Sequence, residues 1–213
     1  DMDAAVNVMK QFVGCPYSEK IDLCDGITIR FIDAGHLLGS SSIEIWMTED
    51  DKTEKIVFSG DVGNIDQPII KDPQLVKEAD YVVIESTYGD RTHGEDIPDY
   101  VGEFTRILRE TFQKGGNVVI PSFAVGRTQE ILYFIREIKE KNLLPEFPGF
   151  EVYVDSPLAI EATNVFNKNV KGCFDEDAMA LVNQGINPLL FQGLKTTITS
   201  DESRQINFDT KPK

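Results

Sequence analysis

The residues that could do chemistry in this chain are its two histidines and a few carboxylates that follow apolar segments. His36 and His93 are the only histidines, so any mechanism that needs an imidazole depends on one or both of them. His36 lies in the Gly- and Ser-rich stretch Asp33–Ser42, where the backbone can approach a ligand closely. His93 lies in a polar loop, and we expect it to be solvated. His36 is the candidate for a functional histidine, and a plain loop histidine is the alternative.

Two carboxylates come directly after apolar segments. Asp61 lies in Ser59-Gly-Asp-Val-Gly63, just beyond Lys55–Phe58, and Glu85 follows Tyr81–Ile84. A carboxylate that emerges at the end of a strand is well placed to bind a metal or to act as a general base. For Asp61 the alternative is a turn residue that hydrogen-bonds to its own backbone.

Two other chemistries find less support in the spacing. The loop Ser122–Arg127 precedes a predicted helix whose N-terminus could hold a phosphate, but neither common glycine-rich phosphate-binding sequence occurs. Ser86, Ser122 and Ser156 could be nucleophiles, but none lies in Gly-x-Ser-x-Gly and no further histidine is left as their base. Nucleotide binding stays open, and serine hydrolysis is set aside.

The first part of the chain predicts strands. Apolar and polar residues alternate in Ile27–Phe31 and in Ile43–Met47, and Lys55–Phe58 leads into the Asp61 segment. Asp1–Val13 has the spacing of a helix already under way. Tyr81–Ile84 is continuously apolar, which predicts a central strand buried on both faces.

The second part predicts strands and helices in alternation, the pattern of a parallel α/β sheet. Strands are expected at 118–121 and 152–154, and a polar tail is expected from Thr199. Apolar residues at helical spacing predict helices over Asp99–Gln113, Thr128–Asn142, Ala159–Asn167 and Asp175–Asn183.

The bulk properties are those of a folded protein of one or two domains. The chain has 213 residues, and no run approaches the ~18 apolar residues of a membrane span. The net charge of −15 disfavours binding to a polyanion. A metal-centred cleft could still supply positive charge locally.

Cys15, Cys24 and Cys173 are odd in number and far from the spacing of a structural zinc site. They favour a reducing compartment, and we expect the protein to be cytoplasmic and not bound to a membrane.

Taken together, five segments resemble the β-CASP branch of the metallo-β-lactamase superfamily, the metal-dependent nucleases of RNA processing. Their order and spacing are also similar across most of the chain. The segments are Asp33–Ser40, Phe58–Gly63, Glu85–Gly89, Pro121–Glu130 and Val154–Ala159.

The resemblance implies a role for each candidate residue. His36 stands at the position of a zinc-binding histidine, and Asp61 at that of an aspartate bridging two zinc ions. Glu85 matches the acidic residue of the first β-CASP motif, near the metal centre, as a catalytic residue. The implied activity is hydrolysis of RNA phosphodiester bonds by two metal ions, with single-stranded RNA as the partner and a homodimer as a candidate assembly.

The same resemblance implies that ligands are missing. The His-x-His-x-Asp-His motif of the family and its later histidines have no counterpart among these residues. We therefore expect an α/β chain in which residues 1–78 form the second half of a metallo-β-lactamase αββα domain and residues 79–213 the first part of a β-CASP domain. The longer protein that contains these residues would be an enzyme, and this chain alone would be inactive. A non-catalytic scaffold in an RNA-processing complex and a small-molecule hydrolase are the alternatives.

Overall fold

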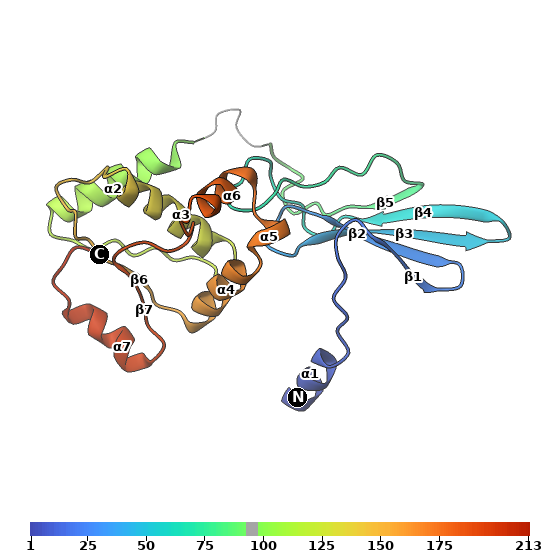
Figure 1. Ribbon diagram of the computed structural model, residues 1–213, viewed down its shortest axis with the longest axis horizontal. Coiled ribbons are helices and arrows are strands. Elements are labelled where there is room, and N and C mark those ends of the chain that lie inside the picture. The colour runs from blue at the N-terminus through green and yellow to red at the C-terminus, as the bar shows by residue number, and fades with distance from the viewer. Residues whose placement is uncertain (93–97) are drawn as a thin grey trace. The chain divides into compact units, whose positions relative to one another are not determined.

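A five-stranded sheet organises the first part of the chain (Figure 1). The computed structural model describes residues 1–92 and 98–213, so the expectation for His93 lies outside the described residues. Two compact units are present, 1–65 with 72–87 and 66–71 with 88–213. Residues 79–87 belong to the first unit, because strand 81–83 joins its sheet. The division into a metallo-β-lactamase segment, 1–78, and a β-CASP segment, 79–213, stays a prediction.

The sheet has the order β1-β2-β3-β4-β5, with β5 parallel to β4 and the other pairs antiparallel. Asp50 and Asp51, both with positive φ, make the tight turn between β3 and β4. The predictions of strands at 27–31, 43–47 and 55–58 are confirmed, while β1 was not foreseen. The elements of this unit are α1 (Met2–Met9), β1 (Lys20–Cys24), β2 (Ile27–Asp33), β3 (Ser41–Glu49), β4 (Lys52–Phe58) and β5 (Tyr81–Val83).

The register gives the two faces of the sheet different chemistry. Ile29 lies opposite Ile45, and Ile45 opposite Ile56, so these side chains share one face. The other face carries Glu44, only 1% exposed, whose carboxylate pairs with Arg30 and Lys55. Burial of this carboxylate is offset by two cations, as a buried charge requires.

The prediction of a buried central strand at 81–84 is wrong. β5 lies at the edge of the sheet, and its three side chains are 53–59% exposed. The apolar composition of 81–84 correctly indicated a strand. Among the described strands only β4 pairs with it, so it is not central in the sheet.

The second unit is a helical layer with a short parallel sheet. β6 (Val152–Val154) and β7 (Leu194–Thr196) pair in parallel, and α2 packs against α3. The predicted helices are confirmed within a few residues at each end. They are α2 (Tyr100–Gln113), α3 (Arg127–Glu140), α4 (Pro157–Lys168) and α6 (Glu176–Asn183), with α5 (Val170–Cys173), α7 (Ser200–Gln205) and the 3-10 helix η1 (Ile206–Phe208) in addition.

Apolar side chains from α2, α3 and the segment before β6 form the core of this unit. Within it, Phe112 and Phe147 make an edge-on contact with ring centroids 5.4 Å apart. Helix starts follow the sequence, because the side chains of Asp99 and Ser156 cap the first turns of α2 and α4. The buried members of the core are Leu108, Phe112, Ile135, Ile138, Leu144 and Phe150.

Two predictions for this unit need correction. The strand predicted at 118–121 is not formed, because among the described residues no strand lies beside this segment to pair with it. The tail from Thr199 is not featureless: Thr199 and Glu202 form a capping box that starts α7. Among the described residues, no helix has both the length and the apolar character needed to cross a membrane.

Candidate active-site loops

The loop between β2 and β3 holds the backbone of His36 and leaves its side chain exposed. The hydroxyl of Ser40 accepts hydrogen bonds from the amides of His36 and Leu37, both at 3.1 Å. Tyr17 fixes Ser40 in turn by donating to its carbonyl at 2.7 Å. Gly35, at φ +61°, makes the turn that places His36 just beyond the C-terminal end of β2.

The loop after β4 packs its backbone directly on the His36 loop. The amide of Gly63 donates to the carbonyl of Ala34 at 2.9 Å. A Cβ atom on Gly63 would lie 1.7 Å from the Gly35 oxygen and 2.7 Å from the His36 nitrogen, so only glycine allows this approach. Asp61, two residues earlier, is exposed.

The loop after β5 is joined to the Asp61 loop by Ser59 and Glu85. The amide of Glu85 donates to the Ser59 hydroxyl at 3.0 Å, and the amide of Ser59 donates to the Val83 carbonyl at 2.9 Å. Oε1 of Glu85 accepts from the amide of Val62 at 2.8 Å, and Oε2 accepts from the hydroxyl of Thr87 at 2.7 Å. Both oxygens of the carboxylate are therefore engaged.

These hydrogen bonds lower the pKa of Glu85. The largest cause is the Thr87 hydroxyl, followed by the Val62 amide, and the electrostatic interaction with His36 acts in the same direction. Each favours the ionised carboxylate. Glu85 is thus a fixed anion that spans two loops.

The structure brings together the three loops that carry His36, Asp61 and Glu85. They meet at the C-terminal ends of β2, β4 and β5 in the first unit, although they are far apart in sequence. Sequence reasoning missed the residues that tie them, Ser40, Ser59 and Thr87. The available signal was a serine directly before β3, at Ser40, and directly after β4, at Ser59; no such signal marks Thr87.

The residues present do not by themselves fit a metal centre. Within residues 1–92 and 98–213, no group of three or more His, Cys, Asp and Glu side chains could hold a metal ion. A catalytic zinc usually has roughly three protein ligands and a water. His36 and Asp61 offer an imidazole and a carboxylate, whereas the Glu85 oxygens already accept hydrogen bonds.

The loop Ser122–Arg127 in the second unit uses its polar groups for its own structure. Gln129, fully buried, accepts from the Gly126 amide at 2.7 Å and donates to the Ala124 carbonyl and the Thr163 hydroxyl. Thr128 donates to the carbonyl of Phe123. These contacts set the start of α3 and give the phosphate-binding alternative no added support.

Comparison with known proteins finds relatives among RNA-processing proteins. Residues 128–213 match the Beta-Casp domain. The chain is 36% identical over 181 residues to the ribonuclease TTHA0252 of Thermus thermophilus. The aligned region covers 85% of this chain and 39% of that protein. The chain is 30% identical over 200 residues to the transcription termination factor FttA of Methanosarcina mazei, covering 92% and 30%. With the endoribonuclease YSH1 of Yarrowia lipolytica it shares 29% over 176 residues, covering 80% and 20%. The chain thus spans less than half the length of each relative.

Proposed function

Because the chain belongs to the β-CASP family of metallo-β-lactamase-type proteins, we propose that it forms part of a ribonuclease that hydrolyses phosphodiester bonds of single-stranded RNA. Two of the relatives described above are named ribonuclease and endoribonuclease. The observation that supports the proposal is the junction of the three loops that carry His36, Asp61 and Glu85, at the ends of β2, β4 and β5.

Within this proposal, His36 and Asp61 are ligands of a two-zinc centre in the complete protein, and the other ligands come from another segment. His36 and Asp61 would hold part of such a centre, whose chemistry would be activation of a water and neutralisation of charge on the phosphate. Glu85 holds the Val62 amide, next to Asp61, and so fixes the orientation of the Asp61 loop. Its ionised state at neutral pH adds negative charge beside the metal ligands.

The test uses the complete protein with zinc and a labelled single-stranded RNA. We expect His36→Ala and Asp61→Asn to abolish metal-dependent cleavage and to lower the zinc content. Glu85→Gln should reduce turnover about 100-fold, the scale of a lost acid–base or positioning group, with little change in thermal midpoint. Asp51→Asn, in the turn between β3 and β4, is the matched control and should leave turnover intact. Full activity of Glu85→Gln would remove the role assigned to Glu85.

A second expectation concerns the 213-residue chain alone. We propose that it has no metal-dependent nuclease activity, because two ligands cannot hold a two-metal centre. Zinc-dependent cleavage by the isolated chain that disappears in His36→Ala would contradict this.

A non-catalytic binding role is the second candidate. It is favoured by the relative named a transcription termination factor. The complete protein would then bind single-stranded RNA without cleaving it, with or without zinc. Zinc content and cleavage, measured on the same preparation, distinguish the two candidates.

We also propose a cytoplasmic location and a homodimer. Cys15 and Cys24 are exposed thiols, which favours a reducing compartment. Light scattering of the complete protein tests the dimer, and fractionation of the cells that make it tests the location.

A further inference from the structure

A cavity of about 450 Å³ lies in the second unit, beside the last turn of α3 and the segments that lead into β6 and β7. Its apolar lining residues are Ile138, Leu144, Phe147, Pro148, Phe150 and Phe191. Pockets that hold small organic molecules have volumes of roughly 300–1,000 Å³ and are lined by apolar and aromatic side chains with a few polar groups among them. The cavity therefore has the size and the lining of a small-molecule site.

Lys139, in the last turn of α3, brings a cation to the wall of this cavity. Its Nζ atom donates a hydrogen bond to the Phe150 carbonyl at 2.6 Å. The same atom lies 3.7 Å from the centroid of the Phe150 ring and 5.8 Å from that of the Phe191 ring. Aromatic faces attract a cation through their negative charge distribution. A carbonyl and two aromatic rings thus hold the ammonium in place.

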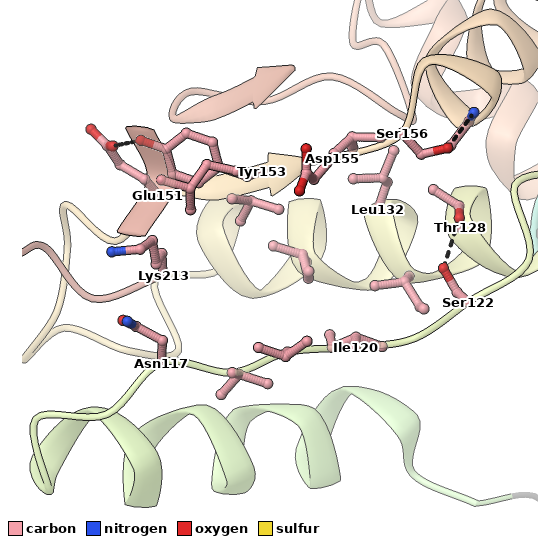
Figure 2. A pocket seen from close by; sticks show the side chains of 18 of the residues that line it. Asn117, Ile120, Ser122, Thr128, Leu132, Glu151, Tyr153, Asp155, Ser156 and Lys213 are labelled. Carbon is pink, nitrogen blue, oxygen red and sulfur yellow. Dashed lines mark hydrogen bonds between the residues drawn. The ribbon is translucent and has the colours of Figure 1, made fainter. Parts of the chain in front are cut away.

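The carboxylates that line the cavity are paired with cations other than Lys139. Figure 2 shows Glu151 at the hydroxyl of Tyr153, which donates to its carboxylate at 3.0 Å. Among the described residues, no carboxylate forms an ion pair with Lys139. The pairs around the cavity are Glu140 with Arg136, and Glu151 with both Lys195 and Lys211.

The ammonium of Lys139 consequently has donors to spare and a charge that its surroundings compensate poorly. An ammonium carries three N–H donors, and within the described part of the chain only the Phe150 carbonyl accepts from it. Burial lowers the pKa of Lys139, and the electrostatic interaction with Glu151 opposes this as the smaller effect. A lowered lysine pKa means that the surroundings disfavour the charged form. An anion that entered the cavity would stabilise that form and would accept the remaining hydrogen bonds.

We propose that this cavity binds a small organic monocarboxylate, whose carboxylate pairs with the Lys139 ammonium and whose planar apolar body lies against the phenylalanine rings. One cation matches one negative charge, whereas a phosphate dianion would need further donors or cations. The apolar lining adds affinity for a ligand with an aromatic body. This inference is independent of the proposed ribonuclease activity.

The test uses the complete protein and three probes: naphthoate, naphthylmethanol as its neutral counterpart of similar shape, and inorganic phosphate. Calorimetry measures the affinity for each probe. We expect naphthoate to bind at least about tenfold more tightly than naphthylmethanol, because its carboxylate forms a charge-assisted hydrogen bond with Lys139. Phosphate, which lacks the apolar body, should not displace naphthoate.

Lys139→Met removes the ammonium and keeps an unbranched side chain. The affinity for naphthoate should fall at least about tenfold in this variant, and that for naphthylmethanol should stay within about twofold. Lys141→Met is the matched control, because the Lys141 side chain is exposed and pairs with Glu137. It should leave both affinities unchanged, and an equal loss of naphthoate binding in the two variants would contradict the proposal.

Protection of the amine in the wild-type protein decides the question if Lys139→Met does not fold. Reductive methylation with formaldehyde, followed by peptide mass spectrometry, reports the access of the reagent to each lysine. Bound naphthoate should suppress methylation of Lys139 and leave that of Lys141 unchanged. No binding of naphthoate at millimolar concentration, equal affinity for naphthoate and naphthylmethanol, displacement by phosphate, or unchanged methylation of Lys139 would each overturn the proposal.

Discussion

The amide of Val62 donates a 2.8 Å hydrogen bond to Oε1 of Glu85, a residue 23 positions later in the chain. This bond ties the segment of Asp61, beyond β4, to the end of β5. If Asp61 binds a metal as proposed, its exposed loop needs such support, because the ligand geometry is otherwise free to relax.

Thr87→Val should raise the pKa of Glu85. The Thr87 hydroxyl is the largest cause of the lowered pKa, and valine keeps the shape but removes the donor. A lowered carboxylate pKa contributes stability above the ordinary value of 4.5, and this stability is lost as pH falls through the folded-state value. Carbon-13 NMR titration of the Glu85 carboxyl measures the change. Thr87→Ser, which keeps a hydroxyl, should titrate like the wild type, and identical curves for all three proteins would refute the assignment.

Gly63→Ala should destabilise the first unit by at least about 2 kcal/mol, the scale of overpacking. The new Cβ would collide with the Gly35 carbonyl, which is backbone and cannot rotate away. Gly14→Ala is the control, since nothing lies within 4 Å of its added carbon. Urea unfolding monitored by fluorescence of Trp46 gives both values. Equal stability of the two variants would mean that the two loops do not touch as described.

Glu44→Gln should cost about 2–3 kcal/mol, because it leaves Arg30 and Lys55 without their shared anion. Burial alone would raise the pKa of Glu44, but hydrogen bonds from Arg30 and Lys55 outweigh it and lower the pKa. The advantage of the wild type should therefore be full above about pH 4.5 and should shrink as pH falls further. Urea unfolding at pH 7 and pH 3 measures it.

The control for Glu44 is Glu54→Gln, whose partner Lys52 is exposed. A surface pair of this kind is worth less than about 1 kcal/mol. A difference between wild type and Glu44→Gln that does not depend on pH would contradict the ion-pair account.

Tyr153→Phe should raise the pKa of Asp209, which is held at about 2 by the amide of Lys211 and next by the Tyr153 hydroxyl. Stability from this contact is present above the ordinary value of 3.8 and is lost as pH falls toward 2. The variant should release the tail at a higher pH than the wild type, visible as faster exchange of the Glu151 amide. Tyr133→Phe is the control, and a tail that opens at the same pH in both variants would refute the prediction.

The sequence by itself determined the elements with clear periodicity and the residues that begin them. Alternation at Ile27–Phe31 and helical spacing in Asp99–Gln113 are local signals, so both elements appear as expected. The placement of Asp61 and Glu85 after strands was also readable, because a strand end is a local feature. The family followed from short motifs in fixed order, and the comparisons agree.

Only the tertiary structure decided which elements become neighbours. Apolar Tyr81–Val83 is an exposed edge strand, and residues 118–121 pair with no other strand that the structure describes. A strand needs a partner, and its own sequence does not specify which segment that is. The contact of Gly63 with Gly35 and the bond from Val62 to Glu85 connect residues 23 or more positions apart, beyond the range of any periodic pattern. Pairing between distant segments depends on the fold as a whole. The junction of the three loops therefore becomes visible only in the tertiary structure.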